Sequence, residues 1–289
     1  MTTLFLGHQM FNKPSELRAT DVWANYWPDT FFSAYRPLGE VYDKMGIAGQ
    51  ATNIESLLTE AEKTGVEKII ISATDVPNAP CTNKDVADAI SNYKDILIGC
   101  ASLNPSNEVG ANVSELHRCV EVDDFRALKV LPFLHGLPPN HARYLPLYET
   151  CVDLGIPLLV LTGHQALLVP SDIGRPTYID DIALRYPELT IVAGPGGWPW
   201  TDELIALAWK HSNLFIHTVI APPAMREQYL PSQLLHYITS LGIGKVMWGT
   251  GAPFMNYVAP LEALDAIAID PDARRAFLWD TAARVWGWD

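Results

Sequence analysis

Eight short apolar runs recur along the chain, and each is followed by an amphipathic stretch. The runs are continuous rather than alternating, as in parallel strands that are covered on both faces of a sheet. They lie at Leu4–Leu6, Val66–Ser72, Ile96–Ala101, Ala127–Leu131, Pro157–Leu161, Thr190–Ala193, Leu214–Ile216 and Lys245–Trp248. Helical patterns lie between the runs, for example Ile54–Thr64, which ends before the capping residue Gly65. Strand–helix alternation predicts a parallel sheet, and eight repeats within 289 residues predict an α/β fold closed as a (β/α)8 TIM barrel.

The alternative is an open, doubly wound sheet, which is expected to carry a glycine-rich turn after its first strand. The turn Gly7–Phe11 is not of that kind, which favours the barrel. We therefore expect a single barrel domain over residues 1–289. Two segments depart from the repeat: residues 11–50, an inserted aromatic segment rich in proline, and residues 268–289, a closing C-terminal helix. The insert either covers an active site or an interface, or packs over the barrel.

The charge balance limits the possible partners. The chain has 20 Lys and Arg residues against 33 Asp and Glu residues, a net charge of −13, which argues against nucleic acid and against an anionic membrane surface. No apolar stretch approaches the ~18 residues of a membrane-spanning helix, and the first ten residues lack the pattern of a signal peptide. The four cysteines form no CxxC pair and fit buried free thiols. We therefore expect a cytoplasmic protein.

Three histidines follow predicted strands, where the chemistry of such barrels lies. His8, His164 and His217 come after the first, fifth and seventh runs. Three neutral imidazoles that converge are a common ligand set for zinc and leave one position open for water. The alternative for each of them is a hydrogen-bonded structural histidine. The sequence has no HxH pair and no HExxH motif that would decide between the two.

Three other residues near the strand ends are candidates for binding a substrate. Lys129 lies in the apolar fourth run, where a buried lysine must be paired or have a lowered pKa. It either anchors a substrate carboxylate, bridges a metal site as a carboxylated lysine, or forms an internal ion pair. Arg175 can form a bidentate hydrogen bond with a carboxylate or stabilise its own loop. Trp198 either lines a pocket or packs against a helix. No GxSxG motif or activated cysteine offers a nucleophile.

Several blocks of the sequence resemble the amidohydrolase-related family that includes aminocarboxymuconate semialdehyde decarboxylase and the resorcylate-type decarboxylases. The resemblance covers residues 4–288, and the blocks that carry it are Leu128–Pro139, Gly174–Leu189, Gly197–Glu203 and Val246–Thr250. It implies a metal-dependent (β/α)8 barrel of the hydrolase type that acts on small, often aromatic, carboxylic acids.

The resemblance is also marked by departures in the metal site. The family's first strand typically ends in a His-x-His pair, which His8 matches only in part because Met10 stands in the second place. The strand-six histidine of the family falls at Pro195, and its strand-eight aspartate falls at Gly251. His164 matches the strand-five histidine. Neither proline nor glycine has a side chain that can bind a metal or move a proton.

These departures lead to competing hypotheses about function. The first is a degenerate subunit, a pseudoenzyme that acts with a metal-holding paralogue in a heteromeric enzyme such as a two-component oxygenase, a decarboxylase or a hydrolase. The second is an active decarboxylase or hydrolase of a small carboxylic acid, with a rewired mononuclear metal site or no metal. The third is a binding protein for a small ligand. The expected cofactor is one divalent metal, zinc, or none, and a homodimer is the alternative to the paralogue.

Overall fold

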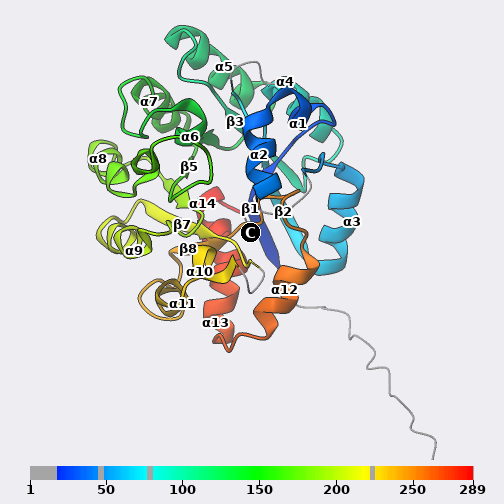
Figure 1. Ribbon diagram of the computed structural model, residues 1–289, viewed down its shortest axis with the longest axis vertical. Coiled ribbons are helices and arrows are strands. Elements are labelled where there is room, and N and C mark those ends of the chain that lie inside the picture. The colour runs from blue at the N-terminus through cyan, green and yellow to red at the C-terminus, as the bar shows by residue number, and fades with distance from the viewer. Residues whose placement is uncertain (1–17, 45–48, 77–80, 222–224, 289) are drawn as a thin grey trace, which may run out of the picture.

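Eight parallel strands form one sheet in the order β1 to β8, and the helices surround it (Figure 1). This computed structural model describes residues 18–44, 49–76, 81–221 and 225–288. A parallel bridge between Ala24 and Ala252 joins the first strand to the segment after the last. The predicted (β/α)8 barrel is therefore confirmed. The strands are β1 (Ala19–Asn25), β2 (Val66–Ser72), β3 (Leu97–Ser102), β4 (Leu128–Val130), β5 (Leu158–Leu161), β6 (Ile191–Gly194), β7 (Leu214–Thr218) and β8 (Val246–Trp248).

The first strand is the one that the sequence analysis misplaced. The runs from Val66 onward lie on β2 to β8, whereas the first strand of the sheet is Ala19–Asn25, inside the segment expected to be an insert. The run Leu4–Leu6 lies outside the described residues. A bulge explains the error, because the register with β2 slips by one residue between Asp21 and Ala24. The strand carries buried polar side chains, so it does not read as an apolar run.

The helices begin and end where local signals place them. Asn53 caps the N-terminus of α3 with its side chain, and Gly65 ends that helix in the left-handed conformation with φ of 75°. The helices are α1 (Phe31–Ala34), α2 (Arg36–Lys44), α3 (Ile54–Thr64), α4 (Asn83–Ile90), α5 (Val109–Glu121), α6 (Pro132–His135), α7 (Leu145–Leu154), α8 (Thr177–Arg185), α9 (Thr201–Lys210), α10 (Arg226–Tyr229), α11 (Ser232–Ile238), α12 (Val258–Asp265), α13 (Pro271–Arg275) and α14 (Thr281–Trp286). Within the described ranges, no helix is long and apolar enough to cross a membrane.

Two layers of core hold the barrel. A large cluster fills the space between the strands and the helices, and a smaller one fills the barrel interior, with one side chain from nearly every strand, such as Val22, Ile70, Leu159 and Met247. All four cysteines are buried and free, as expected from their spacing. The C-terminal helix α14 packs against the end of the barrel interior through Ala282. The interior core supports the strand ends from below and so fixes the site described next.

Candidate functional site

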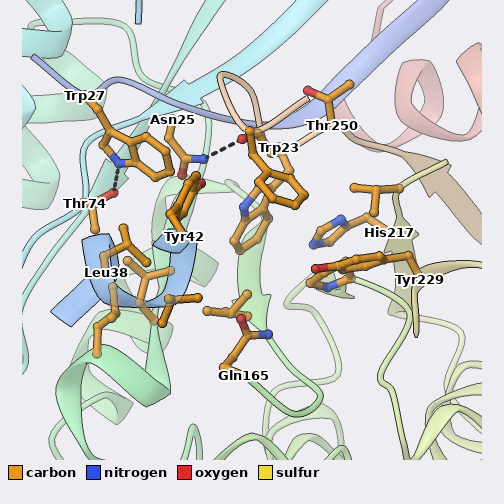
Figure 2. A pocket seen from close by; sticks show the side chains of 18 residues that line it. Trp23, Asn25, Trp27, Leu38, Tyr42, Thr74, Gln165, His217, Tyr229 and Thr250 are labelled. Carbon is orange, nitrogen blue, oxygen red and sulfur yellow. Dashed lines mark hydrogen bonds between the residues drawn. The ribbon is translucent and has the colours of Figure 1, made fainter. Parts of the chain in front are cut away.

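A cavity of about 150 Å³ lies at the carboxyl ends of the strands, and we call it the inner pocket (Figure 2). Its walls are mostly apolar and aromatic, with a few amides, hydroxyls and one imidazole. They are formed by Trp23, Asn25, Trp27, Leu38, Val41, Tyr42, Thr74, Leu131, Leu134, Leu161, Gln165, Pro195, His217, Val219, Tyr229, Thr250, Gly251 and Phe254. This is the end of the barrel at which the sequence analysis expected the site.

The end of β1 and the chain that follows it build one side of the inner pocket. The Asn25 side-chain amide donates to the carbonyl oxygens of Gly251 and Ala252, each at 3.2 Å, which fixes its orientation. The Trp27 indole nitrogen donates to Thr74 Oγ1 at 2.9 Å (Figure 2). Beyond Trp27, α2 contributes apolar and aromatic side chains that close this side over the strand ends.

Lys129 lies on β4 behind this wall, and it is 1% exposed. Its Nζ donates to Asn25 Oδ1 at 2.9 Å and stands 5.1 Å from the centre of the Trp23 ring. Burial lowers the pKa of Lys129 to about 8. The side chain does not itself line the inner pocket. It is a buried cation, held by an amide oxygen and by the face of an aromatic ring.

His217 lies on β7 at the opposite side of the inner pocket from Trp27 and Thr74 (Figure 2). Its ring stacks on Trp23, with centroids 4.5 Å apart and an interplanar angle of 15°. Neither ring nitrogen makes a hydrogen bond of good geometry, although the Gly194 backbone lies near enough to the ring to favour its protonated form slightly. Burial, and then the positive charge of Lys129, lower the pKa of His217 to about 3. The imidazole is therefore neutral at physiological pH.

A glycine on β6 makes room for this imidazole. A Cβ at Gly194 would lie 2.1 Å from the His217 carbonyl oxygen and 2.9 Å from its Nε2. Real Cβ atoms do not approach backbone so closely, so only glycine fits at the end of β6. This close approach explains why the strand ends in Gly194.

Asp21 is fully buried in the barrel wall and ties β1 to the loop after β8. Its Oδ1 accepts from the backbone N–H groups of Trp23 at 3.0 Å and Thr250 at 2.9 Å. Its Oδ2 accepts from the Thr250 hydroxyl and from the Tyr257 hydroxyl, the latter at 3.2 Å. Burial raises the pKa of Asp21, and these hydrogen bonds act in the opposite direction. Both oxygens are already engaged, so the carboxyl group acts as a structural clamp.

His164 and Trp198 line a second cavity of about 210 Å³, the outer pocket, which shares Gln165 and Tyr229 with the inner one. His164 is exposed, its Nδ1 lies 3.1 Å from Ser171 Oγ, and its ring meets Trp198 edge to face at 5.5 Å. The structure thus places His164 and His217 in neighbouring pockets rather than around one point.

Arg175 lies away from both pockets. Its guanidinium group is exposed and forms an ion pair with Glu203, with the shortest contact at 2.6 Å, and it lies 5.8 Å from the Trp200 ring. It therefore has a partner on the protein surface and does not line either cavity.

We expect Arg175→Ala to leave the binding of small molecules in the inner pocket unchanged. We also expect it to shift the melting temperature by no more than about 2 °C, because exposed ion pairs contribute little to stability. Calorimetric titration and thermal unfolding of the variant measure both. A loss of ligand affinity would show that the loop of Arg175 closes over the pocket.

The strand ends do not offer a metal site among the described residues. The corrected first strand puts Trp23 and Asn25, rather than His8 and Met10, in the two places where the resemblance implies a His-x-His pair; His8 lies outside the described residues. In those residues, no three His, Cys, Asp or Glu side chains lie close enough together to hold a metal ion. Pro195 and Gly251 line the inner pocket but bring no donor side chain. The amide oxygen of Asn25 already binds an ammonium group.

Sequence reasoning missed the residues that shape this site most. The sequence analysis did not identify Trp23, Asn25 and Asp21 as site residues, because it placed the first strand too early in the chain. One signal was available: Thr20, Asp21 and Asn25 are polar residues within a short stretch whose other residues are apolar or aromatic. Such residues in a buried strand need partners, and here the partners of Asp21 and Asn25 come from the loop after β8.

Comparison with known proteins agrees with this architecture. Residues 20–288 match the family model described as amidohydrolase. No curated protein sequence matches significantly.

Among solved structures, an uncharacterized TIM-barrel protein from Bordetella bronchiseptica is similar with a TM-score of 0.78 and 22% identity, over 94% of this chain and 99% of that one. The 5-carboxyvanillate decarboxylase of Novosphingobium aromaticivorans, in complex with manganese and 4-hydroxy-3-methoxy-5-nitrobenzoic acid, gives 0.69 and 15%, over 94% and 96%. The 2,6-dihydroxybenzoate decarboxylase from Rhizobium gives 0.65 and 17%, over 93% and 98%. The family model spans nearly the whole chain, and the protein therefore belongs to the amidohydrolase family.

Proposed function

We propose that this chain is a degenerate member of the amidohydrolase family that binds a small single-ring aromatic compound in its inner pocket and acts with a metal-holding paralogue. The paralogue would supply the metal-assisted step. The ligand is an aromatic acid of the kind that the named decarboxylases act on, or the ring that remains after decarboxylation. Three aspects of the site support this proposal: the lack of side chains that could bind a metal, the positive charge of Lys129, and the aromatic walls of the inner pocket.

The observation that carries the proposal is the bond from Lys129 to Asn25. The ammonium nitrogen lies 2.9 Å from Asn25 Oδ1, at the strand end where the family resemblance implies a metal ligand. A protonated lysine repels a divalent cation, and the amide oxygen that would bind the cation is already an acceptor. Trp23 occupies the other position of the His-x-His pair that the resemblance implies, and it offers a cation only the face of its ring. These residues do not fit a divalent metal ion.

The identity of the metal does not change this conclusion. Manganese prefers carboxylate and other oxygen ligands, and zinc prefers imidazole or thiolate. The inner pocket offers no carboxylate among its described lining residues, and its one imidazole is stacked on Trp23. The predicted zinc set of His8, His164 and His217 has two members in separate pockets and one outside the described residues.

The walls of the inner pocket favour a flat ligand. Trp23, Trp27, Tyr42, Tyr229 and Phe254 contribute aromatic surface. A cavity of about 150 Å³ is large enough for one benzene ring. Aromatic pairs gain additional energy when they stack with an offset or meet edge to face.

A second candidate function is a metal-independent decarboxylase or hydrolase of a small carboxylic acid. The observation that favours it is His217, which lines the inner pocket and whose ring nitrogens make no hydrogen bond of good geometry with the protein. A neutral imidazole in this place can accept a proton from a bound water or orient a substrate. Its low pKa makes it a weak base, however, which is why we rank this function second.

The test uses the full chain produced alone and together with a family paralogue that keeps the His-x-His pair. We expect the lone chain to bind 1,3-dihydroxybenzene or 2,6-dihydroxybenzoate by calorimetry, with an affinity that a chelator changes by less than about twofold. We expect no release of CO2 from 2,6-dihydroxybenzoate by the lone chain. We expect the co-produced proteins to purify as a complex that contains metal.

Two results would contradict this proposal. Turnover by the lone, chelator-treated chain that is lost in His217→Leu would establish the second candidate instead. If neither 1,3-dihydroxybenzene nor 2,6-dihydroxybenzoate binds, the inner pocket is not a site for such ligands, and both candidate functions are contradicted. The Arg175→Ala variant serves as the control, because its side chain lies outside both pockets.

A further inference from the structure

We propose that the inner pocket takes its ligand as a neutral phenol, with a ring hydroxyl hydrogen-bonded to His217, and not as the corresponding carboxylate. The inference rests on the proposed function and specifies the ligand of that same pocket. In reaction terms, the chain would bind the product of a decarboxylation.

The unpartnered imidazole is the first argument. His217 is 0% exposed and lines the inner pocket, and neither Nδ1 nor Nε2 makes a hydrogen bond of good geometry, although the Gly194 backbone lies near enough to act on one of them. Buried polar atoms normally have partners, and a buried polar atom without one destabilises the folded protein. A neutral imidazole has one acceptor nitrogen and one donor nitrogen. A phenolic hydroxyl donates strongly and can therefore satisfy the acceptor nitrogen.

The absence of ionised groups from the walls is the second argument. No Asp, Glu, Lys or Arg is among the described residues that line the inner pocket. Two buried ionisable groups are hydrogen-bonded to residues that line the pocket or lie behind it: Lys129 to Asn25, and Asp21 to Thr250 and Tyr257. A carboxylate moved into this pocket would lose its hydration without gaining a direct ionic partner, which is costly. A phenol is uncharged at neutral pH and avoids that cost.

The shape of the pocket is the third argument. Trp23 and His217 stack nearly parallel on one side, and Trp27 with Tyr42 form the other side (Figure 2). A single ring fits the volume of about 150 Å³. A carboxyl group on the same ring adds bulk as well as charge.

The chemistry that supplies such a ligand is the decarboxylation of an aromatic acid that already carries a ring hydroxyl. The bond between the ring carbon and the carboxylate carbon breaks, and its electron pair stays on the ring carbon. That carbon takes up one proton, and CO2 leaves. The reaction needs no oxidant or reductant, and its ring product is the neutral phenol that the inner pocket would receive.

The experiment is a calorimetric comparison of three ligands on the unaltered full chain at pH 7 in metal-free buffer. We expect 1,3-dihydroxybenzene to bind at least about tenfold more tightly than 2,6-dihydroxybenzoate, because the carboxylate lacks a partner. We also expect it to bind about tenfold more tightly than 1,3-difluorobenzene, which has nearly the same shape and cannot donate a hydrogen bond. His217→Leu should remove the preference over the difluoro compound, and Arg175→Ala should keep it.

The outcomes separate this inference from the proposed function. Tighter binding of 2,6-dihydroxybenzoate would overturn the inference while leaving a ligand pocket in place. Equal binding of the dihydroxy and difluoro compounds would overturn the role of His217, even if the leucine variant does not fold. Failure of all three compounds to bind would overturn the proposed function together with the inference.

Discussion

Lys129→Met should remove a rise in stability that the unaltered protein shows between about pH 8 and 10.5. In the unfolded chain the lysine keeps its proton up to its ordinary pKa of 10.5, whereas burial lowers the pKa in the folded protein to about 8. Across that interval the unfolded state binds more protons, so raising the pH favours folding. Full loss of the effect corresponds to about 3 kcal/mol of unfolding free energy. Urea unfolding of both proteins at pH 7.5 and 10.5 measures the difference.

Comparison between the two proteins isolates this one side chain. The pKa of Lys245 is also lowered by burial, to about 8, but that residue is present in both proteins and its contribution cancels. Lys94→Met, at an exposed position, controls for the loss of one positive charge. Parallel stability curves for the unaltered protein and Lys129→Met across this pH interval would show that water reaches the ammonium group in the folded state. The argument from Lys129 against a metal would then lose its basis.

The barrel could be predicted from the sequence because seven of its strands are buried on both faces and short helices separate them. Runs such as Leu158–Leu161 are apolar throughout, so their identity does not depend on distant contacts. Lys129 and His217 could be placed near the site for a related reason. They lie on β4 and β7, and parallel strands carry such residues to one end of the barrel.

The first strand could not be predicted in the same way. Thr20, Asp21 and Asn25 interrupt its apolar pattern, and the burial of Asp21 and Asn25 is possible because their partners arrive from far along the chain. The bond from Thr250 to Asp21 spans 229 positions. The bulge between Asp21 and Ala24 also breaks the alternation of side chains. Local patterning contains neither the bulge nor the distant partner, so Trp23 and Asn25 were not recognised as the residues at the centre of the site.

Trp23→Ala should lower the unfolding free energy by about 3–5 kcal/mol, the range for removing a large buried aromatic side chain. Trp23 is 7% exposed, stacks on His217 and covers the ammonium group of Lys129. Trp209→Ala is the matched control, because that tryptophan is 70% exposed and its loss should change stability by about 0.5 kcal/mol or less. Chemical unfolding of the two variants measures both values.

The same substitution also tests whether Trp23 keeps water away from Lys129. Removing the indole would open the inner pocket onto the ammonium group, and hydration would return the lysine pKa toward its ordinary value. In the Trp23→Ala background, Lys129→Met should therefore change the pH dependence of stability much less than it does in the unaltered protein. If the two single changes were additive instead, Trp23 would not be the shield, and the low pKa of Lys129 would arise from the barrel interior beneath it.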